Sequence, residues 1–318
     1  MGNEASPSPV VQRRRLRAEL RAARQAAGLT QDQAAKAVDW SLSKIIRIEA
    51  GSVGISTVDL KALLSLYGID RPDRTDQLVA LAKAARERGW WSKYSEFLTT
   101  ENQRELLQLI GYESAASIVR NFETLLIPGL LQTEEYAHAV TRQFAEKPSD
   151  GHNEDGESPN GEAEGRDRAE RERRERENKL VEIRMKRQEH LLDSPEPPLM
   201  FFILDEAVVR REVDGKAAMG RQIRWLIELA NRPYLTIEIV PFSQGAYPGL
   251  RGPFVVLEFP DAADDDVVYL ESPRGDLIRR EESEQVLPYR EAFEQLRESS
   301  LGPEATKTFL ADIAKEMT

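Results

Sequence analysis

The first third of the chain repeats apolar residues at the spacing of amphipathic helices, most clearly between Gly28 and Gly51. Two short helical patterns lie in this stretch, and Asp39 and Trp40 interrupt the apolar repeat between them. The apolar positions on the inner faces are Ala34, Ala35 and Val38 in the first pattern and Leu42, Ile45 and Ile48 in the second. Two helices joined by so short a turn are predicted to form a helix-turn-helix unit.

Capping residues mark the ends of both predicted helices. Thr30, with Gln33 three residues later, has the spacing of a capping box, and Ser41 is an N-cap candidate for the second helix. Gly51 occupies the place where a left-handed C-cap residue is common. The caps and the apolar repeat therefore predict the same pair of helices.

Three further helical patterns surround this pair: residues 11–27, a stretch from Ser56 or Thr57 to near Gly68, and residues 73–88. Their apolar stripes predict an all-α, five-helix domain over residues 11–90, preceded by a disordered arm at residues 1–10. The face of residues 11–27 opposite its apolar stripe is basic. Its arginines can contact a DNA backbone or lie in solvent: Arg13, Arg14, Arg17, Arg21 and Arg24.

Strand-like runs alternate with helical patterns in the rest of the chain, which predicts an α+β domain over residues 91–318. The strand-like runs are 200–204, 235–240, 254–259 and 267–270, and the helical patterns are 133–144, 169–192, 217–231, 281–297 and 303–315. A polar, Gly-rich and acidic composition predicts a disordered insertion at residues 147–168. An aromatic cluster at the junction of the two domains is expected to pack between them or to anchor a ligand or partner: Trp90, Trp91, Tyr94 and Phe97.

The net charge of −11 argues against binding to nucleic acid, but the distribution of charge along the chain reverses that argument. Ten basic and six acidic residues lie between Met1 and Gly68, so this part is basic and the remainder of the chain carries the whole negative excess. Such an asymmetry is expected of a DNA-reading domain joined to a regulatory domain. The second helix of the pair adds hydrogen-bond donors on its outer face, namely Ser41, Ser43, Lys44 and Arg47, and Gln31 stands at the start of the first.

Composition excludes several other classes of protein. The chain has no cysteine and only three histidines, without ligand spacing, so we expect no disulfide, no metal site and no cofactor. Mean hydropathy is −0.52, no apolar run approaches a membrane span, and no signal peptide is visible, which together predict a cytoplasmic protein with no membrane partner.

The stretch Gly-Leu-Thr-Gln…Ser-Lys-Ile-Ile-Arg-Ile-Glu-Ala-Gly resembles the XRE (Cro/C1-type) helix-turn-helix family of transcriptional regulators. The resemblance implies that Gln31 contacts a phosphate or a base, that Leu42, Ser43 and Arg47 read bases, and that Ser41 and Lys44 contact the DNA backbone. Glu49 matches an acidic position where a structural role is typical. Leu42 departs from the polar residue that is common at its position, and it can touch a thymine methyl or belong to the core.

The second part of the chain resembles a C-terminal domain of uncharacterised function found on many actinomycete helix-turn-helix regulators. The matching stretches are residues 123–137, Leu204-Asp205-Glu206-Ala207, Val240-Pro241-Phe242-Ser243 and Gly252-Pro253-Phe254. This resemblance implies an antitoxin-like regulator, usually encoded beside a small partner protein.

Two function classes follow, and neither is an enzyme. The first is a homodimeric, sequence-specific regulator of a double-stranded DNA operator, whose second domain binds a partner protein or an effector. The alternative is an antitoxin-like protein whose main role is to bind a small protein encoded by a neighbouring gene, with DNA binding as autoregulation. Carboxylates in or beside the strands could serve a metal-dependent hydrolase, but no catalytic signature connects them: Asp205, Glu206, Glu238, Glu258 and Glu271.

Overall fold

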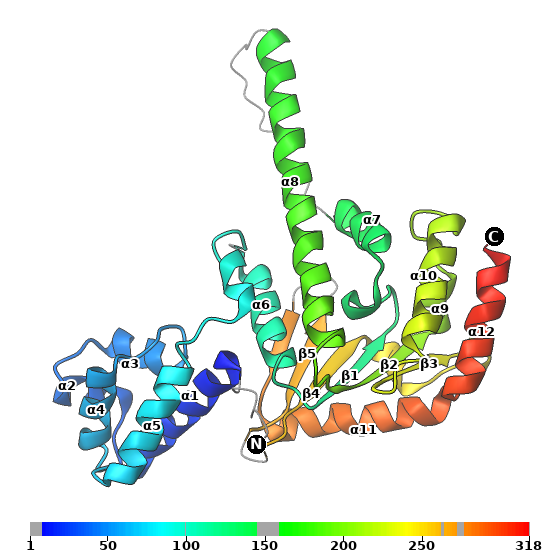
Figure 1. The fold of residues 1–318 in the computed structure, drawn as a ribbon. Coiled ribbons are helices and arrows are strands. Elements are labelled where there is room, and N and C mark those ends of the chain that lie inside the picture. Colours follow the sequence, from blue (N-terminus) through cyan, green and yellow to red (C-terminus); the bar gives the residue numbers. More distant parts are fainter. Residues whose placement is uncertain (1–7, 99, 145–158, 262–263, 272–276, 318) are drawn as a thin grey trace. The chain divides into compact units, whose positions relative to one another are not determined.

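The computed structural model describes residues 8–98, 100–144, 159–261, 264–271 and 277–317, and the chain divides into two compact units (Figure 1). Unit 1 consists of residues 1–116 and 259–265, and unit 2 of residues 117–258 and 266–318. Unit 1 is helical in its first part and unit 2 combines a sheet with helices, so the predicted fold class is confirmed.

Five helices form the first part of unit 1, as the apolar pattern predicts: α1 (Pro9–Ala26), α2 (Gln31–Ala37), α3 (Leu42–Glu49), α4 (Thr57–Leu66) and α5 (Pro72–Ala84). Their apolar stripes meet in one core that extends from Leu16 to Ala82. The helix α1 begins at Pro9, inside the arm predicted for residues 1–10, and residues 1–7 of that arm lie outside the described residues.

The aromatic cluster after α5 packs within unit 1. It forms the short 3₁₀ helix η1 (Trp90–Tyr94), in which Trp91 and Tyr94 are buried, and it is followed by α6 (Glu101–Glu113). A Cβ atom added to Gly111 of α6 would lie 2.2 Å from Cγ2 of Val10 and 3.1 Å from Cζ2 of Trp91. Because Gly111 has no side chain, α6 can approach Val10 and Trp91 closely. The buried Trp91 and Tyr94 therefore pack within unit 1, which corrects the expectation that they pack between domains.

A six-stranded sheet lies at the centre of unit 2, with the strand order β3-β2-β1-β4-β5-β6 (Figure 1). Strands β1, β2 and β3 are mutually parallel, and β4, β5 and β6 continue the sheet as antiparallel neighbours. The strands are β1 (Ile118–Glu123), β2 (Leu199–Asp205), β3 (Leu235–Val240), β4 (Phe254–Glu258), β5 (Val267–Glu271) and β6 (Leu277–Arg280). All four predicted strands are confirmed, and β1 and β6 are additional.

Helices and short 3₁₀ turns surround this sheet. Phe293 and Leu296 of one helix pack on the sheet face that carries Phe122 and Val256. At the β3 edge, the Leu301 amide donates to the Ile239 carbonyl oxygen over 2.7 Å, which covers part of that edge. The helical elements are η2 (Gly129–Leu131), α7 (Glu134–Phe144), α8 (Pro159–Leu192), α9 (Glu206–Arg210), α10 (Lys216–Leu229), η3 (Phe242–Gln244), η4 (Pro248–Arg251), α11 (Ser283–Ser299) and α12 (Pro303–Glu316).

The helix α8 begins earlier than the charge pattern predicts and projects beyond the sheet (Figure 1). Of the insertion predicted at residues 147–168, the part up to residue 158 lies outside the described residues, whereas residues 159–168 are helical. Opposite charges four residues apart support this exposed helix, as in Arg168–Glu172 at 2.9 Å and Glu170–Arg174 at 2.6 Å. Neither α8 nor any other helix in the described ranges is long and apolar enough to cross a membrane.

Candidate nucleic-acid interface

Local rules of the sequence fix the turn between α2 and α3. Thr30 and Gln33 form the predicted capping box, and Ser41 Oγ accepts a hydrogen bond from the Lys44 amide over 3.3 Å. Asp39 adopts a left-handed conformation with φ +54°, which aspartate tolerates better than most residues. The next amide, that of Trp40, donates back to the Ala35 carbonyl over 2.9 Å and so closes the end of α2.

The other end of α3 depends on Gly51 for two reasons. Its φ of +71° lies in the left-handed region, and the Ser52 amide donates to the Arg47 carbonyl over 2.9 Å, as in a Schellman C-cap. A Cβ atom at this position would also lie 2.4 Å from Cδ of Arg17 on α1. The predicted C-cap is therefore confirmed, and it brings α1 close to the end of α3.

Glu49 joins α1, α2 and α3 through one buried carboxylate. Its side chain is only 6% exposed, and Arg24 of α1 donates to both oxygens, with Nε–Oε1 at 2.6 Å and Nη2–Oε2 at 3.0 Å. Gln31 Nε2 of α2 donates to the same carboxylate over 2.9 Å. The hydrogen bond to Glu49 raises the pKa of Arg24 above its ordinary value, so Arg24 keeps its charge. Glu49 thus has the structural role that its position implies.

These contacts correct one sequence expectation and qualify another. Arg24 is buried and holds Glu49 and the Leu29 carbonyl, so it does not belong to the solvent-facing arginines of α1. The helical pattern of α1 does not reveal this role, because the partner of Arg24 lies 25 positions along the chain. Gln31 is half-buried at the start of α2, and its amide nitrogen serves Glu49, which leaves its amide oxygen for any contact with DNA.

The outward face of α3 contains both polar and apolar side chains. Ser41, Ser43 and Arg47 are exposed, and Arg47 Nε donates to the Ser43 carbonyl of its own helix, over 3.3 Å. Leu42 is 41% exposed, which excludes the alternative that it belongs to the core. Ile46, which the sequence reading missed, lies on the same face at 43% exposure. A helical-wheel projection finds it, because Ile46 is one turn after Leu42.

Lys44 is held more firmly than its place on an outer face suggests. Its ammonium lies 3.1 Å from Oδ2 of Asp59 on α4 and 3.5 Å from the ring centroid of Trp40. The side chain is half-buried, since 34% of it is exposed. Lys44 therefore links α3 to α4 and to the turn before it, while its ammonium stays near the helix start.

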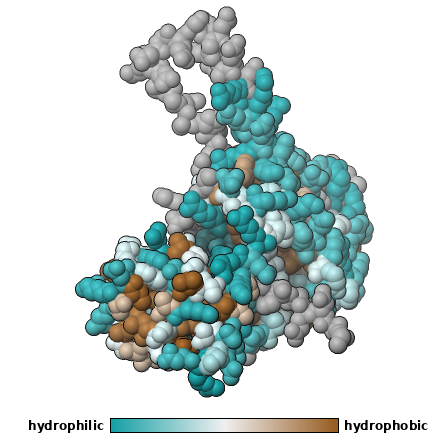
Figure 2. Space-filling model, turned by 60° about the vertical axis from the view of Figure 1, so that its left-hand side comes forward, coloured by the Kyte–Doolittle hydropathy of each residue, from teal (hydrophilic) through white to brown (hydrophobic). Residues whose placement is uncertain are grey.

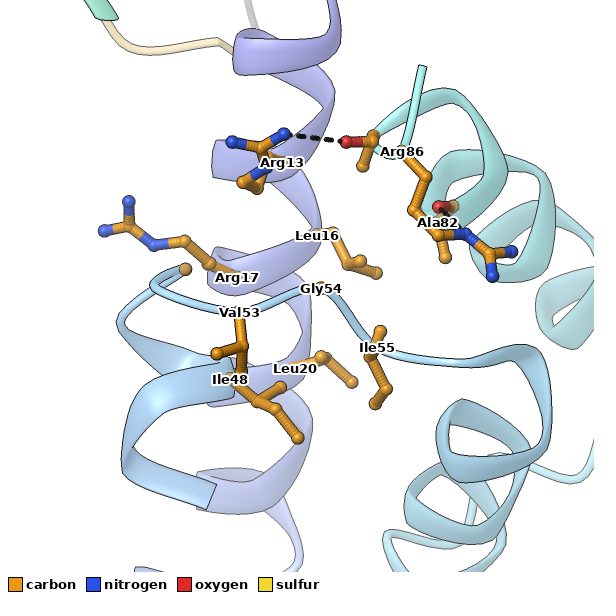
Figure 3. Close-up of a pocket in the computed structure, with 12 residues that line it drawn as sticks. Arg13, Leu16, Arg17, Leu20, Ile48, Val53, Gly54, Ile55, Ala82 and Arg86 are labelled. Atoms are coloured by element: carbon orange, nitrogen blue, oxygen red, sulfur yellow. Dashed lines mark hydrogen bonds between the residues drawn. The ribbon is translucent and has the colours of Figure 1, made fainter. Parts of the chain in front are cut away.

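The basic face of α1 is partly used within unit 1. Arg13 Nη2 donates to the Ala85 carbonyl over 3.1 Å, at the rim of a small cavity between α1, α5 and the loop after α3 (Figure 3). The cavity volume of about 20 Å³ accommodates one water molecule and no larger ligand. Arg21 is exposed on α1 and retains the position expected of a backbone contact.

The five strand carboxylates considered for catalysis all belong to unit 2. Four of them accept hydrogen bonds from neighbours: Glu258 from Arg120, Glu238 from Ser300, Glu206 from the Phe242 amide and Asp205 from the Ala207 amide. Within the described ranges, no three His, Cys, Asp or Glu side chains gather closely enough to hold a metal ion.

Comparison with known protein families agrees with this geometry. A helix-turn-helix domain model matches residues 15–78, which include α2 and α3. A model described as a domain of unknown function (DUF5753) matches residues 106–179 and 163–312, about two thirds of the chain. No curated protein and no solved structure matches this chain. The helix-turn-helix domain supports a DNA-binding regulator, and the chain belongs to the DUF5753 family, with a helix-turn-helix domain consistent with an XRE-type regulator before that domain.

Proposed function

We propose that the chain is a sequence-specific transcription regulator that places α3 in the major groove of an operator. The observation that carries this proposal is the outward face of α3, where Arg47 and Ser43 are exposed while Glu49 anchors the opposite side of the helix. A firmly held helix with free donors on its outer face is what base recognition requires.

Each exposed residue of this face is given a role by its chemistry. Arg47 grips a guanine edge by two hydrogen bonds, and Ser43 contacts the neighbouring base. Ser41 and Lys44, at the start of α3, contact phosphates, and Lys44 keeps Asp59 as its partner in the free protein. Gln31 adds a contact through its amide oxygen at the start of α2.

The proposed regulator acts as a homodimer on two half-sites. The eight residues of α3 span about 12 Å, so a single copy covers only a short segment of the groove. Two copies read half-sites about 34–36 Å apart and gain affinity because the second contact is made at a high effective concentration.

Unit 2 is assigned the binding of a small partner protein encoded by a neighbouring gene, or of an effector. Two features support this division of labour. Unit 2 has its own sheet and core, and the residues after Gly68 carry the whole negative excess of the chain, which phosphates would repel. The proposal includes no catalysis, because no catalytic signature connects the five strand carboxylates and four of them are engaged in the contacts described above.

The test is selection of DNA by the full chain from a random-sequence duplex library, followed by footprinting of the enriched sequence. We expect a repeated half-site with a spacing of one helical turn or a multiple of it. Recovery of no enriched sequence, or binding that does not distinguish it from scrambled duplex, would contradict the proposal.

A further inference from the structure

Leu42 and Ile46 form an exposed apolar ridge on α3. Their exposed fractions, 41% and 43%, are far above those of Ile45 and Ile48, which are 1% and 4% exposed in the core of unit 1. The helix therefore has apolar residues on two sides, of which only one is buried. Figure 2 shows that the helical bundle of unit 1 does present hydrophobic side chains at its surface.

This apolar ridge, Leu42–Ile46, runs beside a polar ridge made of Ser43 and Arg47. Both pairs are four residues apart, and adjacent residues differ by about 100° around the helix, so the two ridges share the outward face. A surface that binds DNA with Arg47 and Ser43 brings Leu42 and Ile46 toward neighbouring base edges in the same groove. A single exposed apolar side chain needs no explanation, but two of them aligned on the reading face do.

We propose that Leu42 and Ile46 determine part of the specificity by contacting C5-methyl groups of thymine. This inference rests on the proposed function and extends it to the bases recognised. The thymine methyl is the apolar group that base pairs display in the major groove, and neither side chain can donate or accept a hydrogen bond. Arg47 then selects guanine, while the apolar ridge selects thymine on neighbouring base pairs.

The separation of the two side chains predicts two distinct thymine contacts. Leu42 and Ile46 are separated by about 6 Å along the helix axis, at 1.5 Å per residue. This exceeds the distance of about 3.4 Å between stacked base pairs, so one methyl group does not serve both side chains. Each half-site therefore contains two thymine methyls, one for each side chain.

Replacement of thymine by deoxyuridine tests this directly, because it removes the C5-methyl and leaves every hydrogen-bonding group in place. The full chain is titrated with the selected duplex, with deoxyuridine introduced at one position at a time. We expect about a fourfold loss of affinity at each of two positions per half-site, the value of one buried methyl. Deoxyuridine at a thymine outside the half-sites should have no effect.

The Ile46→Ala variant assigns one of these methyls to its side chain. It should bind the thymine duplex about sixteenfold more weakly, because both protomers of the dimer lose the methyl contact, and it should lose its sensitivity to deoxyuridine at one position of each half-site while sensitivity at the other position remains. The control is Val58→Ala on α4, which removes an apolar side chain that is 78% exposed but lies off α3. It should behave as the wild type on every duplex.

Failure of the thymine-methyl inference and failure of the proposed function give different results in these titrations. A chain that selects a specific duplex but binds its deoxyuridine versions equally well overturns the role of the apolar ridge and leaves the proposed function intact. An Ile46→Ala variant with undiminished sensitivity at both positions overturns the assignment to Ile46. A chain that selects no duplex overturns the proposed function and this inference with it.

Discussion

At the scale of single residues, the orientation of α3 depends on the contacts of one carboxylate. Glu49 is reached by Arg24 from α1 and by Gln31 from α2, and the side chains of Glu49 and Arg24 are only 6% and 10% exposed. Removal of one member of a buried ion pair leaves the other without compensation for its lost hydration, which costs more than the pair itself contributes.

We therefore expect Arg24→Ala to lower the free energy of unfolding of unit 1 by about 3 kcal/mol. The matched control is Arg21→Ala, one turn away on α1, where the side chain is exposed and the change should be within about 0.5 kcal/mol. Urea titrations followed by circular dichroism give both values. Equal and small effects of the two substitutions would contradict the anchoring role of Glu49.

Local residues could be predicted from the sequence, and long-range partners could not. Thr30, Ser41 and Gly51 follow capping rules that involve neighbours within a few positions, and all three have the expected roles. Arg24 and Lys44 were placed on outer faces because their partners, Glu49 and Asp59, are 25 and 15 positions away. Helical periodicity contains no information about such pairs.

Among the secondary-structure elements, the pattern misses two strands, of which β1 lies in the middle of the sheet and β6 at its edge. Polar and charged residues interrupt the short apolar alternation of β1, and Arg120 and Asn121 argue against a buried strand. In the structure, the charge of Arg120 is compatible with a buried strand, because its guanidinium pairs with Glu258 on β4 and Glu294 on α11. The sequence pattern does not predict this strand, because the residues that neutralise the charge of Arg120 lie more than a hundred positions away along the chain.

The end of β1 also contains a carboxyl group with an unusual pKa. Burial and the nearby charge of Glu271 on β5 raise the pKa of Glu123 to about 8. Burial also raises the pKa of Glu271, although Arg184 of α8 opposes that shift. Glu123 therefore retains its proton at neutral pH in the folded chain, whereas it is ionised in the unfolded chain.

The stability of unit 2 should consequently fall as pH rises. Because the pKa of Glu123 is higher in the folded chain than its ordinary value of 4.5, stability is fully present below about pH 4.5 and is progressively lost up to about pH 8. Glu123→Gln removes this dependence, so the variant should gain melting temperature over the wild type at pH 8.5 but not at pH 4.5. Parallel melting profiles for the two proteins would show that Glu123 ionises normally.

At the scale of the whole molecule, the two units differ in how much of the chain they need. The core of the helix-turn-helix region uses residues between Leu16 and Ala82 only. Unit 1 also takes in α6 and the segment 259–265, where Asp264 pairs with Arg15 at 3.1 Å. This pair is partly exposed, so its loss should have a small effect on stability.

A fragment of residues 1–116 should therefore fold without unit 2 and bind the selected duplex more weakly than the full chain, because any dimer contact supplied by unit 2 is lost. A shorter fragment, residues 1–90, lacks α6, whose Gly111 lies against Val10 of α1, and should melt at a lower temperature. Circular dichroism of both fragments measures this. An unfolded 1–116 fragment would show that the helical core depends on unit 2.

Whether α3 reads DNA sequence is measured by titrating Arg47→Ala with the selected and a scrambled duplex across a salt series, beside Lys44→Ala. We predict that Arg47→Ala loses about 1–3 kcal/mol of binding free energy with the selected duplex and almost none with the scrambled one. Lys44→Ala should lose affinity for both duplexes and reduce the salt slope by about one. If Arg47→Ala lost the same affinity for both duplexes, α3 would bind phosphates without reading bases, which would contradict the proposed function.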